Sequence, residues 1–333
     1  MKSLVCKKCV LDSGTKGVTI NPDTGLCQFC EQVTVPSSQE RENLKKKMDG
    51  IFASPTHTGK HDVILAISGG IDSCYALYRL HKEYPHLRIL AVQFDNGFIP
   101  DIAFENAQKI CDISKSSYFR IEIDHGKLCD TFKKAALSKD VYSESAKYRA
   151  SDVCNTCMHT IKQKMIEIAI KTNTRYLIFA FSPGQTDAAF VPLTKPFITW
   201  SRRLFEKQLA KMGIEEKNLY LADEGVIASS PKDLELTIIH PYLIWDYNKS
   251  QFRKKCIELG WIPPDLSDPH SSNCLLNEYA IKNHLDKYNI HPYIHDIAAL
   301  VRNGYLPREE ALETLQSEFS EEAIKNVHKK LNS

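Results

Sequence analysis

Apolar and polar residues alternate through the middle of the chain in a way that predicts strands separated by helices. Four short apolar runs are rich in β-branched and aromatic residues, as buried strands are: 63–67, 87–94, 117–123 and 176–181. Helical spacing predicts four intervening helices: after Asp72, over 103–113, near 128–137, and over 160–171. This alternation indicates an α/β fold with a doubly wound, mainly parallel sheet and helices on both faces.

The flanking regions follow other patterns. Residues 33–60 are polar and charged, and we interpret them as a connector with one solvated helix. The α/β domain spans 61–275, and its part 190–260, which holds an apolar run typical of a fifth strand, is interpreted as an insertion or lid. Residues 276–333 are helical and amphipathic, and they are candidates for a homodimer contact.

Composition narrows the class of protein. Of the 333 residues, 43% are apolar and 25% are charged, as in soluble globular proteins. No segment approaches the roughly 20 apolar residues that cross a membrane, and the N-terminus lacks the apolar core of a signal peptide. We therefore expect a cytoplasmic protein with no membrane partner. The net charge of +2 gives no global basic field, which leaves only a local patch for RNA.

A glycine-rich turn follows the first predicted strand. It reads Ser68-Gly69-Gly70-Ile71-Asp72-Ser73 and leads into a helical pattern. Strand, glycine turn and helix form an anion site, since the backbone N–H groups face inward and the helix N-terminus adds partial positive charge. Phosphate is the expected anion. No Gly-Lys-Ser/Thr follows, so this is not a Walker loop.

Four cysteines form two Cys-x-x-Cys pairs near the N-terminus. They are Cys6, Cys9, Cys27 and Cys30. This spacing is typical of a closed tetrahedral zinc site, and a segment of about 30 residues needs such a metal to fold. We expect a zinc ribbon over 1–32 with a structural rather than catalytic Zn²⁺.

A third pair, Cys154 and Cys157, stands immediately before the predicted helix 160–171. Two thiolates make half of a zinc site, or two ligands of an iron–sulfur cluster whose best third ligand is Cys274. His159 beside them is a weaker ligand candidate, interpreted as lining the site or lying on the surface. The other cysteines have apolar neighbours and are expected in the core: Cys74, Cys111, Cys129 and Cys256.

The glycine turn resembles the PP-loop of the N-type ATP pyrophosphatases. The resemblance implies that Ser68, Gly69, Gly70 and Ser73 hold the pyrophosphate of ATP, and that Asp72 helps to bind Mg²⁺. It also implies that main chain near Ala66, Ile67 and Phe94 takes the adenine. Ligands of such sheets sit at the carboxyl ends of the strands, and one such end here is the loop 182–187. The resemblance implies that Gly184 and Asp187 of this loop bind the nucleotide, with Asp187 as a second candidate for Mg²⁺.

The order of motifs resembles two narrower families. A zinc ribbon, a PP-loop, a Cys-x-x-Cys pair and one later cysteine are arranged as in the iron–sulfur tRNA-thiolation enzymes, over about residues 1–280. The chain departs from them because no cysteine follows Cys274 and because its 182–185 loop reads Ser-Pro-Gly-Gln. Both ends, Cys6-Lys-Lys-Cys9-Val10 and 303–311, resemble the N-acetyl sugar amidotransferases, which lack the internal cysteine pair.

These resemblances imply a reaction in which ATP activates a carbonyl by adenylation. Sulfur then replaces oxygen on a tRNA base or a small metabolite. Sulfide or a persulfide supplies it, with a [4Fe-4S] cluster at Cys154, Cys157 and Cys274. Asp72 and Lys162 would assist, Lys162 by orienting the adenylate. An amidotransferase that uses ammonia from a glutaminase is the first alternative. A non-catalytic zinc-ribbon RNA-binding module is the second.

Overall fold

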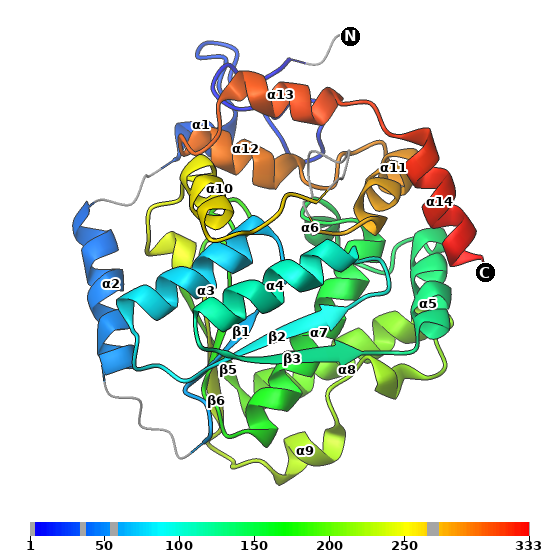
Figure 1. Ribbon diagram of the computed structural model, residues 1–333. Coiled ribbons are helices and arrows are strands. Elements are labelled where there is room, and N and C mark those ends of the chain that lie inside the picture. Colours follow the sequence, from blue (N-terminus) through cyan, green and yellow to red (C-terminus); the bar gives the residue numbers. More distant parts are fainter. Residues whose placement is uncertain (1–3, 34–37, 54–58, 265–272, 333) are drawn as a thin grey trace.

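A six-stranded sheet forms the centre of the computed structural model, which describes residues 4–33, 38–53, 59–264 and 273–332 (Figure 1). Its strand order is β3-β2-β1-β4-β6-β5. The strands are β1 (Val63–Ala66), β2 (Ile89–Asp95), β3 (Ser117–Glu122), β4 (Tyr176–Phe179), β5 (Phe190–Thr194) and β6 (Glu235–Ile239). All pairs are parallel except that of β5 with β6. The predicted doubly wound α/β fold is confirmed.

Burial explains the order of the strands. Every residue of β2 is buried, as a central strand requires, whereas β3 at the edge carries exposed polar residues such as Arg120 and Glu122. Alternate residues of β1 point to opposite faces. Val63 and Leu65 join one hydrophobic core and Ile64 joins another.

Helices cover both faces of this sheet (Figure 1). On the face of Val63 and Leu65 pack α2 (Ser38–Ala53), α3 (Ile71–Glu83), α4 (Asp101–Ile113) and α10 (Lys249–Glu258). On the face of Ile64 pack α7 (Asp152–Lys171), α8 (Lys195–Lys211) and α9 (Glu224–Ser229). Two short 3₁₀ helices lie in connecting segments: η1 (Lys217–Leu219) follows α8, and η2 (Pro241–Leu243) follows β6.

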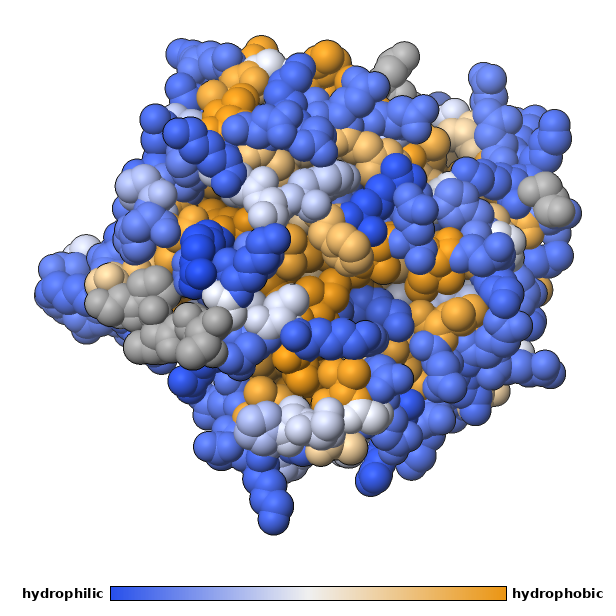
Figure 2. All heavy atoms as spheres, turned by 60° about the horizontal axis from the view of Figure 1, so that its bottom comes forward, coloured by the Kyte–Doolittle hydropathy of each residue, from blue (hydrophilic) through white to orange (hydrophobic). Residues whose placement is uncertain are grey.

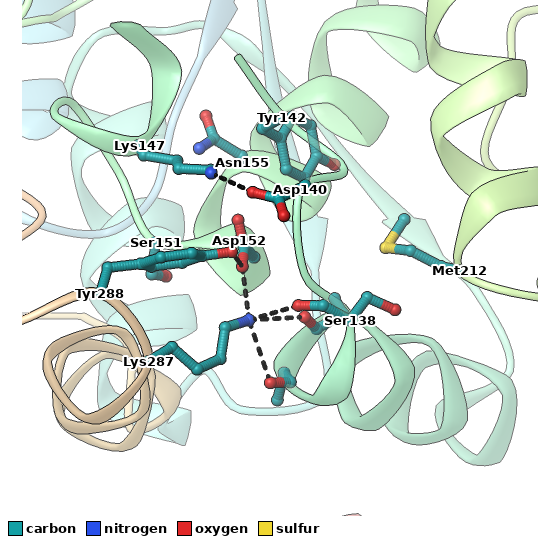
Figure 3. A network of polar contacts seen from close by, with 12 residues as sticks. Ser138, Asp140, Tyr142, Lys147, Ser151, Asp152, Asn155, Met212, Lys287 and Tyr288 are labelled. Carbon is teal, nitrogen blue, oxygen red and sulfur yellow. Dashed lines mark hydrogen bonds and ion pairs between the residues drawn. The ribbon is translucent and has the colours of Figure 1, made fainter. Parts of the chain in front are cut away.

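A third core joins the C-terminal helices to the sheet. Around it pack α5 (His125–Leu137), α6 (Glu144–Lys147), α11 (Leu276–Tyr288) and α14 (Glu321–Leu331). The Lys287 ammonium on α11 pairs with the Asp152 carboxylate at the start of α7 and donates to the Ser138 carbonyl at the end of α5 (Figure 3). Tyr288 donates to the same carboxylate at 2.9 Å. This network fixes α11 against the first turn of α7.

The N-terminal cysteine segment packs on the C-terminal helices. It contains one short helix, α1 (Gln28–Glu31), and its core is shared with α12 (Ile294–Arg302) and α13 (Arg308–Gln316) (Figure 1). Arg308 donates to the carbonyl oxygens of Cys9 (3.0 Å) and Cys6 (3.2 Å). Several apolar residues of α12 and α13 are thus covered within the chain, and the homodimer contact stays a prediction.

Three expectations change. The predicted long helix begins at Asp152 instead of residue 160, because the Ser151 hydroxyl caps it by accepting from Cys154 N–H. The connector helix α2 is not merely solvated, since Met48 and Phe52 are buried in the core. The stretch 190–260 contributes β5 and β6 to the sheet. Parts of the connector, 34–37 and 54–58, lie outside the described residues.

One face of the surface is largely hydrophilic (Figure 2). Figure 2 shows one face on which hydrophilic side chains cover most of the area and hydrophobic ones gather in patches between them. Within the described part of the chain, no helix has both the length and the apolar character needed to cross a bilayer.

Candidate functional site

The glycine turn lies between β1 and α3, as predicted. Gly69 has φ +78°, and a Cβ atom there would lie 1.9 Å from the Ala103 carbonyl oxygen of α4. Trp261 donates its indole N–H to the Gly69 carbonyl at 2.8 Å. Only glycine fits this position, because a side chain would meet both backbone strain and a direct clash.

The two serines of the turn hold its shape. Ser73 Oγ accepts from Ser68 N–H at 3.0 Å and donates to the Gly70 carbonyl at 3.2 Å. Gly70 is the N-cap of the 13-residue helix α3, and no side chain caps that end. The first N–H groups of α3 and the positive end of its dipole are therefore offered to an anion.

Asp72 lies in the first turn of α3 beside residues from distant parts of the chain. Tyr247 donates to its carboxylate at 3.4 Å, and Tyr242 donates to its main-chain carbonyl. Burial raises the pKa of Asp72, and the positive charge of Lys249 opposes this rise. The sequence does not predict that Tyr247 and Lys249 lie near Asp72, because no local pattern connects them to the glycine turn. The assignment of Asp72 to Mg²⁺ stays a prediction.

The predicted adenine region follows the ends of β1 and β2. Ala66 ends β1 half-buried, and Ile67 N–H donates to the Val92 carbonyl at 2.9 Å. The Phe94 side chain is buried in the core, so Phe94 offers a ligand its main chain alone. These positions lie at the carboxyl edge of the sheet, as expected.

Asp95, at the end of β2, is a buried carboxylate that pairs with Arg120 and His125. Burial by itself would raise the pKa of Asp95. The N–H of Gly97 and the Arg120 guanidinium outweigh burial and leave that pKa below its ordinary value. Asp95 therefore stays ionised and fixes the turn that carries Asn96.

Three cysteines surround the end of β2 and the start of α7. Asn96 Nδ2 lies 3.4 Å from Cys274 Sγ and 3.8 Å from Cys157 Sγ, so these two sulfurs are no farther apart than the sum of the distances. Cys154 Sγ lies 3.4 Å from the Tyr293 hydroxyl. The structure thus brings Cys274 beside the predicted pair. Asn96 and Tyr293 were not foreseen, because each is a single polar residue without a motif.

The loop that carries Cys274 also contacts the glycine turn. Asn273 donates its amide to the Ser68 carbonyl at 3.2 Å, and Leu275 N–H donates to the Phe98 carbonyl at 2.9 Å. Cys274 therefore lies between the candidate phosphate site and the cysteine pair. The anion site and the three thiols share one edge of the sheet.

Three thiols from Cys154, Cys157 and Cys274 are a donor set that an iron–sulfur cluster or a single soft metal ion can take. Burial raises the pKa of Cys157, and the neighbouring Cys274 and Cys154 raise it further. Such thiols ionise only with a cation bound between them. Among the described residues, the four N-terminal cysteines form a group whose sulfurs all lie within 4.8 Å of one another, and these three do not. The cluster at Cys154, Cys157 and Cys274 stays a prediction.

Lys162 of α7 lies beside the loop that follows β4. The Lys162 ammonium is 5.8 Å from the Phe181 ring centroid, and burial, with Arg149 nearby, lowers its pKa. A Cβ on Gly184 would lie 2.3 Å from the Asp296 carbonyl oxygen of α12, so this loop packs tightly on a C-terminal helix. Asp187 is exposed. The nucleotide-binding roles of Gly184 and Asp187 stay predictions.

His159 occupies a different environment from the one expected. Its ring stacks on Tyr142 with centroids 5.6 Å apart and lies 5.2 Å from the Phe205 ring. Burial lowers the pKa of His159 to about 4. His159 is a half-buried, neutral residue packed between aromatic rings. Of the four cysteines expected in the core, three are buried and Cys129 is partly buried.

The four N-terminal cysteines form the predicted group. Their sulfur atoms all lie within 4.8 Å of one another and all four residues are buried. Cys9 Sγ and Cys27 Sγ are 3.6 Å apart. Four converging thiols leave no open position, which suits a structural metal and not a catalytic one.

Comparison with known proteins gives one relative and several similar folds. No protein-family model matches the chain. An uncharacterized protein of Methanocaldococcus jannaschii is 26% identical over 313 residues, which cover 93% of this chain and 92% of that protein.

Three solved structures are similar at low sequence identity. The U34-tRNA thiolase of Methanococcus maripaludis, solved with its [4Fe-4S] cluster, is 14% identical with a TM-score of 0.39, and the match covers 100% of this chain and 89% of that one. An NH3-dependent NAD synthetase from Campylobacter jejuni is 14% identical (TM-score 0.32; 68% and 99% covered). The NMN synthetase from Francisella tularensis is 10% identical (TM-score 0.34; 87% and 95% covered). All three TM-scores lie below 0.5, so the fold and the resemblance to the PP-loop enzymes stand on the chain's own sheet and glycine turn.

Proposed function

We propose that this chain is an ATP-dependent adenylating sulfurtransferase, which replaces the oxygen of a carbonyl on a tRNA base or a small metabolite by sulfur. One observation carries the proposal. The loop of Cys274 contacts the glycine turn through Asn273, while Asn96 contacts both Cys274 and Cys157. A phosphate site and a sulfur-binding site so connected suit a reaction that activates a carbonyl and then delivers sulfur to it.

The first step uses the glycine turn. The turn and the N-terminus of α3 hold the pyrophosphate of ATP while the carbonyl oxygen of the substrate attacks the α-phosphorus. Asp72 would help to hold Mg²⁺, and Lys249 beside it adds positive charge where pyrophosphate departs. The product is an adenylate whose oxygen, unlike that of the carbonyl, is a good leaving group.

The second step uses the three cysteines. Cys154, Cys157 and Cys274 would hold a [4Fe-4S] cluster, which when bound supplies an iron without a protein ligand to carry sulfide. Sulfide is the donor: its bond to the substrate carbon forms as the bond from that carbon to the AMP oxygen breaks, whereas a persulfide donor would also need a thiol as reductant to cleave its S–S bond. Lys162, which is half-buried beside the loop after β4, would orient the adenylate phosphate. Cys6, Cys9, Cys27 and Cys30 would hold a structural Zn²⁺.

A second candidate function draws on the ends of the chain. Arg308 of α13 holds the carbonyls of Cys6 and Cys9, so the two ends that resemble the N-acetyl sugar amidotransferases form one unit. An amidotransferase would need ammonia from a glutaminase and would be indifferent to Cys154→Ser. A non-catalytic RNA-binding module is disfavoured because the glycine turn keeps its full hydrogen bonding.

The test uses protein purified and reconstituted without oxygen. Unmodified tRNA and a UDP-N-acetyl sugar serve as probes, with ATP, Mg²⁺ and labelled sulfide, and pyrophosphate and labelled product are measured. We expect Cys154→Ser, Cys157→Ser and Cys274→Ser to lose sulfur transfer by about 100-fold or more while still binding ATP. Cys129→Ser, on the partly buried face of α5, is the matched control and should keep activity. Transfer from ammonia that survives Cys154→Ser would support the amidotransferase instead, and no ATP binding by calorimetry would support the RNA-binding module.

A further inference from the structure

The first turn of α12 contacts two sites that are far apart in the sequence. Tyr293, the N-cap residue of α12, places its hydroxyl 3.4 Å from Cys154 Sγ. His295, in the same turn, packs edge-on against Phe29 of the N-terminal cysteine segment, with the two ring centroids 5.5 Å apart. One turn of helix therefore joins the internal cysteine pair to the group of four N-terminal cysteines.

The side chain of Tyr293 spans both sites by itself. It packs against the hydrophobic core that contains all four N-terminal cysteines. At its other end, the hydroxyl donates to the Asn277 side-chain oxygen at 2.8 Å. Asn277 lies in the first turn of α11, shortly after Cys274, and its oxygen is 3.7 Å from Cys154 Sγ. A second polar contact thus holds the hydroxyl beside the sulfur.

The N-terminal cysteine segment also supports the rest of α12. Ile297 and Ala298 of this helix are buried in the core of that segment. The Arg302 guanidinium lies 5.5 Å from the Phe29 ring centroid. A segment of about 30 residues around four cysteines needs a bound metal to fold. Loss of that metal should therefore loosen α12 and, with it, Tyr293.

Cys154 depends on contacts outside its own helix. The Ser151 hydroxyl accepts from the Cys154 N–H, which fixes the backbone in the first turn of α7. The direction of the sulfur is set separately, by the side-chain torsion and by what the sulfur contacts. Partners that orient metal-binding side chains contribute about 10- to 100-fold to metal affinity. Tyr293 and Asn277 are placed to be such partners.

We propose that Tyr293 is a positioning residue through which the metal-bound N-terminal cysteine segment holds Cys154 in its metal-binding orientation. The inference rests on the proposed function for the metal at Cys154. It goes beyond that function because it gives the N-terminal segment a role at the reaction site. The metal in the N-terminal segment then controls how firmly the internal cysteine site keeps its own metal.

The first test measures backbone hydrogen exchange in protein that carries zinc and no iron. Cys30→Ser removes a zinc ligand, and Cys129→Ser of α5 is the control. In Cys30→Ser we expect amides over 290–298 and 152–157 to exchange about 10-fold faster, while those of α3 keep their rates. Unchanged exchange over 152–157 in zinc-free Cys30→Ser would overturn the inference. If Cys30→Ser fails to fold, the same expectation is tested on Phe29→Leu, which keeps all four thiols.

The second test measures iron release to a chelator after reconstitution without oxygen. Tyr293→Phe removes only the hydroxyl, and Phe29→Leu removes the ring that faces His295. Each variant should release iron about 10-fold faster than wild type while keeping its zinc. Tyr279→Phe on α11 is the matched control, because the Tyr279 hydroxyl makes no hydrogen bond within the described residues.

The double variant of Phe29→Leu with Tyr293→Phe distinguishes coupling from two independent effects. If Phe29 acts through Tyr293, the double variant should release iron no more than about two-fold faster than Tyr293→Phe alone. Effects that multiply to about 100-fold would overturn the coupling, as would wild-type iron release in Tyr293→Phe. A wild type that takes up no iron would instead contradict the cluster of the proposed function, and hydrogen exchange would then decide this inference.

Discussion

The side-chain amide of Asn96 donates to Cys274 Sγ at 3.4 Å, and the two residues are 178 positions apart in the sequence. The same amide lies 3.8 Å from Cys157, while its oxygen accepts from Phe98 N–H at 2.9 Å. Asn96 directly follows β2, so the sheet itself positions the donor. This arrangement joins the end of a central strand to two of the three candidate cluster ligands.

Removing this donor should weaken metal binding at the three cysteines. Asn96→Ala deletes both contacts to sulfur, and Asn96→Asp keeps an acceptor for Phe98 N–H while placing negative charge beside the thiolates. Outer-shell partners of metal ligands contribute about 10- to 100-fold in affinity, so both variants should lose iron to a chelator faster, Asn96→Asp most. Asn43→Asp, exposed on α2, is the control. Equal iron retention in all three proteins would contradict a role for Asn96.

Gly69→Ala should be far more damaging than Gly213→Ala. Both glycines have positive φ, +78° and +70°, but only Gly69 faces a backbone atom, the Ala103 oxygen, at 1.9 Å from a built Cβ. Strain alone should cost Gly213→Ala about 1 kcal/mol of unfolding free energy. Gly69→Ala should cost more than about 3 kcal/mol and abolish ATP binding. Denaturant titration and calorimetry compare the two, and similar losses at both sites would refute the close-approach argument.

Arg308→Ala should loosen the N-terminal cysteine segment. Arg308 bonds the carbonyls of Cys9 and Cys6, and hydrogen bonds to charged groups contribute about 1.5–3 kcal/mol. We expect lower thermal stability and faster zinc release to a chelator. Arg308→Lys should behave nearly as badly, because an ammonium cannot reproduce the two-pronged contact. Glu313→Gln, exposed on α13, should match wild type, and unchanged zinc release in Arg308→Ala would show that the contact is dispensable.

Asp95 should make stability depend on pH in the acid range. Its pKa in the folded chain lies below the ordinary value, because Gly97 N–H and Arg120 outweigh the opposing effect of burial. A lowered pKa stabilises the folded state above the unfolded value of about 3.9, and that stabilisation disappears as the pH falls through the folded pKa.

Asp95→Asn tests this dependence. The variant should be less stable by about 1–3 kcal/mol at pH 7, and the difference should shrink below about pH 4. Unfolding free energies from urea titrations at both pH values give the comparison. A deficit that stays constant across this range would mean that Asp95 acts by shape and not by charge. Asp101→Asn, on the exposed start of α4, is the control.

Local patterns were sufficient to predict the sheet and the glycine turn. The apolar runs predict strands, the Ser-Gly-Gly-x-Asp-Ser sequence predicts the turn, and the cysteine spacing predicts the metal group. Each of these patterns spans only a short part of the chain. Strand β5 was missed, because Pro192 argues against a strand, yet an edge strand tolerates proline. The start of α7 could have been found from Ser151-Asp152, an N-cap followed by an acidic first turn.

The supporting residues of the site could not be predicted from the sequence. Asn96 and Tyr293 are single polar residues outside any motif, and they meet Cys274 and Cys154 only because segments 178 and 139 positions apart pack together. The sequence does not predict the place of Lys249 near Asp72 either, since only folding brings α10 beside the first turn of α3. These contacts depend on packing between distant segments, which the spacing of residues in the sequence does not indicate.

The metal content of the anaerobically reconstituted chain tests the central claim most directly. We predict about four iron atoms and four acid-labile sulfides per chain, with about one zinc. In Cys274→Ser the iron should fall to near zero while the zinc stays. Wild-type protein that holds zinc but no iron, or Cys274→Ser protein with undiminished iron, would contradict a cluster held by Cys154, Cys157 and Cys274.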